Sequence, residues 1–388
     1  LNLSVFKLSK IKMVDNIMQL VERHKINPNH KYFYDVDKLC FLSKNLYNRA
    51  NYIIRQEFIN TSKEKQKRLR KHAIWIRYND IQKLLHETND VDYYALPTKV
   101  SQQVLELLDK DWKTFFGTIK DWNKYPEKYK GRPCLPKYKN KLDGRNTLVY
   151  TIQAISGKKL KNGTINPSGT NFIFNTKQKN INQIRIVPKS NHYVLEIIYE
   201  KKIKKSKLNK NKIAGGDIGV NNLIAVTSND REFRPFLING RNIKSINQYY
   251  NKEKARLMSE LGKVKTKTSK MIKRLYYKRE CKIDYQLHCI SSYVIQTLLK
   301  RKIKTFVIGK NNNWKNEVNM GDKNNQEFVS IPHAKFIEML KYKAELVGME
   351  VIVNEESYTS KCSFIDFESL EHHDKYLGKR KHRGLFVS

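Results

Sequence analysis

The chain has 388 residues, with 76 Lys and Arg against 37 Asp and Glu, so its formal net charge is +39. This length favours several domains, and so large a basic excess favours a polyanionic partner, with nucleic acid first. The five cysteines are far apart, which argues against disulfides and a zinc ribbon. No stretch is as apolar as a membrane span, so we expect a cytoplasmic location, in the cytosol or nucleoid.

The first third of the chain is predicted to be mainly helical. Residues 1–31 have a weak pattern, and from residue 32 to residue 125 the apolar residues recur at helical spacing. Four aromatic residues follow this spacing, so we expect them in a core and not as platforms on which bases stack: Trp112, Phe115, Phe116 and Trp122. A Pro-rich, basic link follows over residues 126–141.

Residues 146–202 change period. Short runs of β-forming residues alternate with turn residues, which predicts a small antiparallel barrel or sheet. Residues 201–212 then carry seven lysines. This basic linker is either a solvated connector or a direct contact to phosphates, and the sequence favours neither.

From Ile213 onward the pattern is α/β. Two adjacent strands are expected at residues 213–219 and 223–227, and a third at 233–238. A long polar helical region, interrupted near residues 266–269, precedes a strand at 305–308, a helix at 332–347 and a strand at 349–354. This order fits an RNase-H-like layout, so the predicted fold class is multidomain α+β.

Few acidic residues are placed to hold metal ions. Hydrolysis of a phosphodiester by two metal ions needs several carboxylates that converge from separate elements. Asp217 ends the first strand of the α/β region, Glu355 and Glu356 follow its last strand, and the strand at 305–308 leads into Gly309 without an acid. The acids after Glu356 lie in a polar segment without a predicted helix or strand: Asp366, Glu368, Glu371 and Asp374. A third fixed carboxylate is not apparent.

Several long motifs resemble the transposon-encoded TnpB/OrfB proteins. Residues 355–364, Glu-Glu-Ser-Tyr-Thr-Ser-Lys-Cys-Ser-Phe, are similar to the Tyr-Thr-Ser segment of that family. Residues 216–222, Gly-Asp-Ile-Gly-Val-Asn-Asn, resemble its first RuvC motif. Further similar stretches are residues 44–48, 96–103, 135–138, 324–328, 331–332, 341–343, 378–380 and 383–386.

The resemblance implies a compact RNA-guided effector. A helical recognition (REC-like) domain, residues 32–125, would be inserted in an oligonucleotide-binding (WED-like) β-barrel formed by residues 1–31 and 126–205. Residues 206–388 would form an RNase-H-like RuvC domain, C-terminally truncated and without a zinc ribbon. The implied partners are a guide RNA of the omega-RNA kind and double-stranded DNA with a short flanking motif, bound by a monomer. Mg²⁺ would be needed only for nuclease activity.

The motifs and their basic or aromatic neighbours supply the expected nucleic-acid-binding residues. These are Tyr47, Asn48, Arg49, Tyr52, Arg55, Gln56, Lys99, Gln102, Gln103, Lys130, Arg132, Lys137, Tyr138, Lys139, Asn324, Asn325, Lys379, Arg380, Lys381 and Arg383. Tyr47, Tyr52 and Tyr138 stand among Lys and Arg, and for them base stacking and packing are about equally expected.

The departures from the family concern catalysis. The second RuvC acid normally stands where this chain has Gly309, and a branch of the family places it in the Glu-Glu pair, so Glu355 or Glu356 would substitute. The usual cysteine pairs are absent, which leaves Cys362. Family members continue past Arg-Gly-Leu-Phe to an Asp-x-Asn segment on a final helix, whereas this sequence stops at Ser388. We therefore expect a nuclease-dead, RNA-guided binder that represses transcription, as the TnpB-derived TldR repressors do.

Three alternatives remain at this stage. The chain could be a fragment of an active RNA-guided endonuclease, a decayed product without an RNA partner, or a transcription factor that binds DNA alone. The last would call for a compact reading helix and a dimer, and the sequence indicates neither.

Overall fold

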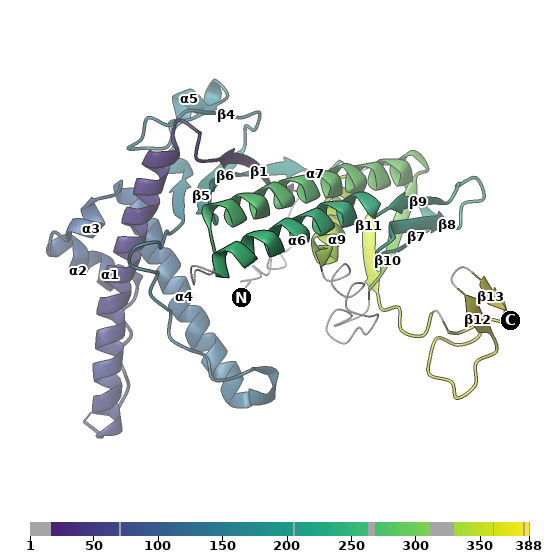
Figure 1. Ribbon diagram of the computed structural model, residues 1–388. Helices are drawn as coiled ribbons and strands as arrows, with labels where there is room; N and C mark the ends of the chain where they lie inside the picture. The colour runs from purple at the N-terminus through teal and green to yellow at the C-terminus, as the bar shows by residue number, and fades with distance from the viewer. Residues whose placement is uncertain are drawn as a thin grey trace. The chain divides into compact units, whose positions relative to one another are not determined.

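The computed structural model describes residues 17–69, 71–204, 206–262, 268–310, 330–359, 361–382 and 385–387 (Figure 1). The chain divides into two compact units, residues 1–201 and residues 202–388. Each unit has a hydrophobic core of its own. Within the described ranges, no helix combines the length and the apolar character needed to cross a membrane.

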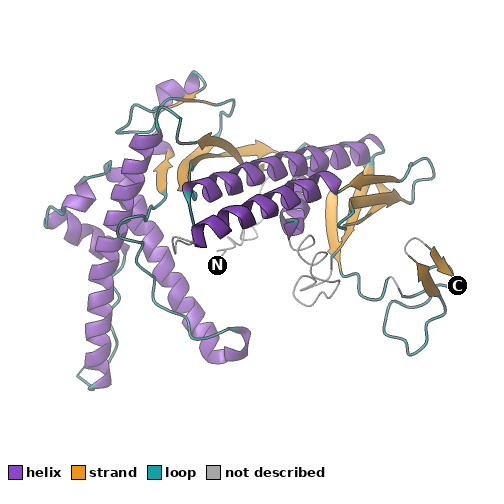
Figure 2. Cartoon of the chain, viewed as in Figure 1, coloured by secondary structure: helices purple, strands orange, loops and turns teal. Residues whose placement is uncertain are grey.

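The first unit begins with a strand followed by helices (Figure 2). These are β1 (Ile17–Ile26), α1 (Phe33–Gln66), α2 (Tyr78–Glu87), α3 (Val91–Tyr94), α4 (Thr98–Lys124) and the short 3₁₀ helix η1 (Pro126–Lys128). Trp112 of α4 is fully buried, its ring lies edge-on to Phe58 of α1 at 5.6 Å, and its indole N–H donates to Asn51 at 3.1 Å. Phe115 and Phe116 pack partly buried on the same core. The prediction of a core is therefore confirmed for Trp112, Phe115 and Phe116, whereas Trp122 is half-buried and is not among the residues of this core.

The remaining elements of this unit form a four-stranded sheet and a small second one. They are β2 (Leu148–Thr151), the 3₁₀ helix η2 (Ile152–Ala154), α5 (Gly157–Lys161), β3 (Thr164–Ile165), β4 (Phe174–Asn175), β5 (Ile181–Pro188) and β6 (Tyr193–Lys202). The larger sheet has the order β1-β6-β5-β2, and β3 pairs with β4.

The predicted barrel is not closed in the described residues. β1 and β2 are the two edges of the larger sheet, and no pairing joins them among the residues described. β2 has four residues, all paired with β5, and the chain leaves it directly for η2. A closed barrel needs every strand paired on both sides, so the alternative of an open sheet holds here.

Helix α1 is tied to the segment before β2 by an ion pair. Arg145 donates two hydrogen bonds to the two carboxylate oxygens of Asp37, at 2.8 and 2.9 Å, and Tyr193 of β6 also donates to this carboxylate. The hydrogen bonds from Arg145 are the largest cause that lowers the pKa of Asp37. A two-pronged Arg–carboxylate contact fixes orientation as well as distance, so Asp37 joins helix and sheet.

The second unit contains a five-stranded mixed sheet. Its strands are β7 (Asn209–Asp217), β8 (Asn222–Ser228), β9 (Phe236–Asn239), β10 (Ile303–Gly309) and β11 (Glu350–Asn354), in the order β11-β10-β7-β8-β9. β8 runs antiparallel to both β7 and β9, whereas β10 runs parallel to both β7 and β11. This order and these directions are those of the predicted RNase-H-like layout.

Helices cover one face of this sheet. They are α6 (Arg241–Gly262), α7 (Lys270–Lys300) and α9 (His333–Glu345), and their apolar side chains share a core with the strands. Gly216 of β7 belongs to the covered face, where a Cβ atom would stand 2.7 Å from the buried ring of Phe306. The glycine therefore allows β10 to place a phenylalanine against its neighbouring strand.

Two details differ from the prediction. β7 begins at Asn209, inside the predicted basic linker, because its backbone N–H donates to the carbonyl of Lys302 at 2.8 Å and the residue pairs with Ile303 of β10. The end of the chain also forms a hairpin of β12 (Lys379–His382) and β13 (Leu385–Val387).

Candidate functional site

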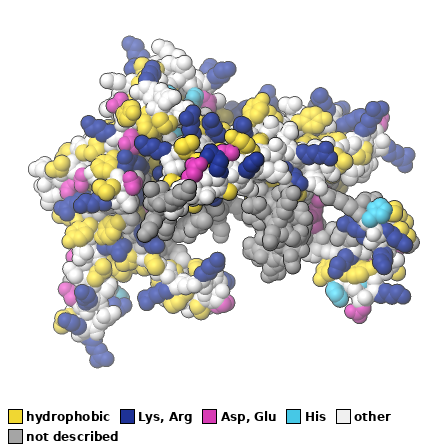
Figure 3. Space-filling model, viewed as in Figure 1, with side chains coloured by type: hydrophobic (Ala, Val, Ile, Leu, Met, Phe, Trp, Pro, Cys, Tyr) yellow, Lys and Arg dark blue, Asp and Glu magenta, His cyan; other side chains and the backbone are white. Residues whose placement is uncertain are grey.

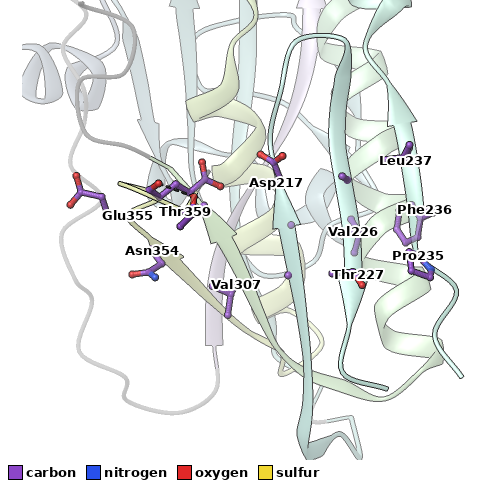
Figure 4. A pocket seen from close by; sticks show the side chains of 15 residues that line it. Asp217, Val226, Thr227, Pro235, Phe236, Leu237, Val307, Asn354, Glu355 and Thr359 are labelled. Carbon is purple, nitrogen blue, oxygen red and sulfur yellow. Dashed lines mark hydrogen bonds between the residues drawn. The ribbon is translucent and has the colours of Figure 1, made fainter. Parts of the chain in front are cut away.

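The carboxyl ends of three neighbouring strands form the candidate site (Figure 4). β7 ends at Asp217 and β10 ends at Gly309, whose register partner on β11 is Asn354. Ile308 pairs with Gly216, so Gly309 and Asp217 stand at the same level of adjacent strands. Glu356 follows shortly after β11. Because parallel strands end at the same edge, residues that are far apart in the sequence meet here.

Glu356 occupies the space above Gly309. A Cβ atom built on Gly309 would lie 1.5 Å from Oε1 of Glu356 and 2.0 Å from its Cδ. Any side chain at position 309 would therefore displace this carboxyl group. The acid that the strand itself lacks is supplied by the segment after the next strand, at the same point in space.

Electrostatics agrees with this placement. Burial, and then the negative charge of Asp217, raise the pKa of Glu356. A carboxylate that burial and a like charge disfavour is stabilised by a cation between the two acids. Asp217 and Glu356 are therefore two like charges held close together.

Glu355 lies differently. Its side chain is exposed, and its Oε1 accepts a hydrogen bond from Ser357 Oγ at 3.3 Å. Figure 4 shows it pointing away from Asp217. Of the two acids between which the sequence could not choose, the geometry favours Glu356 as the partner of Asp217.

The two acids line a cavity of about 830 Å³ on the sheet face opposite the helices. Gly215, Ala225 and Val307 line it with small or apolar side chains, and Leu237 is 65% exposed beside it. Small neighbours allow a phosphate backbone to approach a metal ion held by carboxylates, whose oxygens suit Mg²⁺. Across the described ranges, no group of three or more His, Cys, Asp or Glu is placed to hold a metal ion. The acids that line this cavity in the described part of the chain are Asp217, Glu355 and Glu356.

Two of the later acids serve the local fold. The carboxylate of Glu368 accepts from the backbone N–H groups of Ser363, at 2.6 Å, and Leu377, at 2.9 Å. Asp366 accepts from the hydroxyl of Ser363 at 2.5 Å. Neighbouring Cys362 is buried, and its Sγ lies 3.8 Å from the carbonyl oxygen of Glu371. No helix or strand was predicted to hold this segment, and these hydrogen bonds hold it instead.

Several expected nucleic-acid-binding residues hold the basic link instead of facing solvent. The side chain of Asn48 donates to the carbonyl of Lys139 at 2.9 Å and accepts from its N–H at 2.8 Å. Arg55 donates to the carbonyl of Pro136 at 2.8 Å, and its guanidinium lies 4.9 Å from the ring centre of Tyr138. Tyr47 is buried. Its hydroxyl donates to Asp111 at 3.1 Å, and burial raises its pKa.

Sequence reasoning missed two members of this contact. Asn51 is fully buried and donates to the carbonyl of Pro136 at 3.0 Å, and Lys44, also buried, donates to the carbonyl of Lys141 at 2.8 Å. Together with Asn48 and Arg55 they form one face of α1. Polar residues recurring at helical spacing opposite an apolar stripe were the available indication. We call this contact, between Lys44, Asn48, Asn51 and Arg55 and residues 136–141, the link clasp.

Most other expected contact residues are accessible. Arg49, which bonds to Asp90, and Gln103, which bonds to Glu106, have partners within the protein. Tyr52, Gln56, Lys99, Lys130, Arg132, Lys137, Tyr138, Lys379, Arg380 and Lys381 are exposed, and Gln102 and Lys139 are half-buried. Asn324, Asn325 and Arg383 lie outside the described residues. Nucleic-acid contact stays a prediction for all of them.

Two family models match the second half of the chain. The probable transposase family OrfB_IS605 matches residues 196–315, and the Cas12f1-like TNB domain matches residues 333–384. No curated protein matches the chain.

Solved structures show low similarity. A Cas12f1–sgRNA–target DNA complex gives a TM-score of 0.49 at 12% identity and covers 87% of this chain and 77% of that chain. A CRISPR-Cas12f ternary complex gives 0.33 at 13%, covering 84% and 73%. C2c1 of Alicyclobacillus acidoterrestris with single-guide RNA gives 0.31 at 7%, covering 85% and 64%.

The second unit is thus a mixed α+β fold in which Asp217 and Glu356 meet at the carboxyl ends of neighbouring strands. The two family models, which between them begin in β6 and end in the C-terminal hairpin, make this part of the chain similar to OrfB transposases and Cas12f1-like proteins. The resemblance inferred from the motifs is thereby confirmed.

Proposed function

We propose that this protein is an RNA-guided, sequence-specific binder of double-stranded DNA, and that residues 1–388 bind their target without cutting it. Occupation of a promoter by such a complex would repress transcription in the bacterial cytosol. The observation that carries the proposal is the site itself, where two carboxylates, Asp217 and Glu356, converge in a family member with a net charge of +39.

The charge supports a polyanionic partner. Each phosphate that Lys or Arg neutralises releases counterions, so binding should weaken steeply as salt is raised. In the proposed division of labour, guide RNA supplies the sequence by base pairing, while the protein recognises backbone, shape and a short flanking motif. Exposed basic residues such as Lys137 and Arg132 are suited to this task.

The proposed domain roles follow the two units. Residues 32–125 would form the recognition domain, and residues 1–31 with 126–205 the oligonucleotide-binding part, which is an open sheet in the described residues. Residues 206–388 would form the RuvC-like part. In it, Asp217 and Glu356 would hold a divalent cation, which when bound supplies Lewis-acid chemistry.

Two ligands are expected to bind a cation weakly and to place no attacking water. Cleavage depends on sub-ångström placement of metal and water, whereas binding of RNA and DNA does not involve these acids. We therefore propose that no cofactor is needed for binding.

The test is made on the purified complex. RNA that co-purifies with the chain is sequenced, a duplex matching its variable 3′ end is synthesised, and binding and cleavage are measured with Mg²⁺ present. We expect a stable complex and intact DNA, with binding lost after full RNase digestion. A duplex with a scrambled target serves as the control. Absence of a defined RNA, or DNA binding that survives RNase, would refute RNA guidance.

The second candidate is an active RNA-guided endonuclease of which this chain is a part. The favouring observation is that Glu356 fills the position of the missing strand acid, which preserves half of a metal site. Efficient cutting of the matched duplex by the purified complex would establish this function. So would an in-frame Asp-x-Asn segment after Ser388 in the gene, combined with cleavage by the extended protein.

A further inference from the structure

A second cavity lies between helices α6 and α7, which pack side by side (Figure 1). It has a volume of about 610 Å³ and shares no lining residue with the cavity at Asp217. Its lining includes the apolar side chains of Ile246, Leu257 and Leu275, and Leu257 is 7% exposed. The groove therefore has an apolar floor in an otherwise polar helix pair.

Three cations of α7 stand along this groove. Arg274, Lys278 and Lys282 are spaced four residues apart, so they form one row with a rise of about 6 Å between neighbours. All three are exposed, and none makes an ion pair or hydrogen bond with the described residues. Lys and Arg side chains are spread along this helix pair in Figure 3. Like charges in such a row repel one another, and an anionic ligand would relieve that repulsion.

The other two arginines of the groove are engaged within the protein. Arg256 donates to Glu253 at 3.2 and 3.1 Å and to Glu260 at 2.7 Å. Arg279 donates to Asn247 at 2.7 Å and to the carbonyl of Ser330 at 3.0 Å. The row on α7 is therefore the part of the groove's charge that is available to a ligand.

Aromatic rings face the row from α6. Tyr249 is 61% exposed and Tyr250 lies next to it, with the guanidinium of Arg279 at 5.1 Å from the ring centre of Tyr250. Grooves that combine cations along the backbone path with aromatic rings bind single-stranded nucleic acid, because every base can stack on a ring whatever its sequence. Charge and rings together indicate this class of ligand.

Two polar groups of the groove favour ribose over deoxyribose. Both bonds from Arg256 to Glu253 end on Oε2, which leaves Oε1 as an acceptor, and the hydroxyl of Ser245 is exposed. A carboxylate repels phosphate but accepts a hydrogen bond from a 2′-hydroxyl, the group that distinguishes RNA from DNA. We propose that the groove between α6 and α7 binds a single-stranded segment of RNA. This inference rests on the proposed RNA partner and assigns it a place on the chain.

The experiment uses the full chain and a short fluorescein-labelled oligoadenylate, as RNA and as DNA, in fluorescence anisotropy over a range of salt. The charge variant replaces Arg274, Lys278 and Lys282 with Gln. A matched control replaces the exposed residues Arg231, Arg241 and Lys300 with Gln and removes the same charge outside the groove. Loss of three phosphate contacts should reduce the slope of log K against log salt by about 2 for a single strand, and the control should leave the slope unchanged.

The ring is tested separately. Tyr249→Leu keeps an apolar side chain without an aromatic face, and we expect it to weaken RNA binding by about tenfold. Ultraviolet cross-linking of the co-purified RNA, followed by peptide mapping, should place a cross-link at Tyr249. Ser245→Ala should weaken binding of the RNA oligonucleotide and leave binding of the DNA oligonucleotide unchanged.

The outcomes separate the two proposals. If no defined RNA co-purifies, the proposed function fails, while the oligonucleotide measurements still report on the groove. If RNA co-purifies but the charge variant matches its control and no cross-link forms at Tyr249, the groove inference is overturned alone. Equal or tighter binding of the DNA oligonucleotide overturns the assignment to RNA.

Discussion

The substitution Gly309→Ala should move the side chain of Glu356 without unfolding the protein. The three atoms nearest to a Cβ at position 309 all belong to the side chain of Glu356, at 1.5, 2.0 and 2.3 Å. That side chain can rotate away, so we expect the free energy of unfolding to change by less than about 1 kcal/mol, with the gain of alanine over glycine in a strand partly offsetting the rearrangement. The carboxylate would, however, leave Asp217.

The cost should fall on cation binding. Two unit charges 4 Å apart attract by about 1 kcal/mol in water, so a divalent ion that loses one carboxylate loses about 2 kcal/mol, or about 30-fold in affinity. The measurement is a Mn²⁺ titration by electron paramagnetic resonance at low salt, with thermal unfolding of the same samples. Gly215→Ala is the matched control, because that glycine lines the same cavity and its Cβ would meet nothing within 4 Å. Unchanged Mn²⁺ affinity in Gly309→Ala, or equal loss in both variants, would refute the placement of Glu356.

Three further predictions concern stability. Glu356→Gln should raise the free energy of unfolding at neutral pH by up to about 1 kcal/mol, as measured by urea unfolding. The pKa of Glu356 is raised in the folded state, so the wild-type protein loses stability as pH rises through that pKa. The difference in stability between variant and wild type should vanish near pH 4. Asp37→Asn should destabilise the protein by about 1–3 kcal/mol. The pKa of Asp37 is lowered in the folded state, so this loss of stability should be present at neutral pH and disappear as pH falls below about 4. A loss that persists in acid would contradict the ion pair. Asn51→Ala leaves the buried indole N–H of Trp112 without its partner, while the carbonyl of Pro136 keeps its bond from Arg55, and should cost about 1–3 kcal/mol. The exposed variant Gln56→Ala should change stability by less than about 0.5 kcal/mol.

The sequence predicted the α/β unit well because β8 and β10 contain buried apolar residues and its helices are long. The strand predicted at residues 305–308 corresponds to β10 (Ile303–Gly309), and the helix predicted at 332–347 to α9 (His333–Glu345). Periodicity of apolar residues is strong in such elements. The start of β7 was missed because Asn209 and its neighbours are polar and are recruited by pairing with β10, a contact that local pattern does not encode.

The site was only partly predictable. Both Glu355 and Glu356 follow β11, and alternation along a strand does not extend into the turn that aims them. The space above Gly309, which the side chain of Glu356 fills, distinguishes Glu356 from Glu355. Of the predicted barrel or sheet, the described residues form an open sheet, because closure depends on long-range pairing between edge strands, which composition does not encode. The roles of Asn48 and Arg55 were unexpected because a segment without regular structure was not foreseen as their partner.

The link clasp has a consequence for how this protein can change. Residues 136–141 follow their path because α1 side chains occupy backbone carbonyls and an N–H of the link, as a neighbouring strand would. The side chains of Lys137 and Tyr138 remain exposed. Their identity can therefore vary over generations while the course of the chain stays the same. The binding preference of such a surface can change by single substitutions that leave the protein folded.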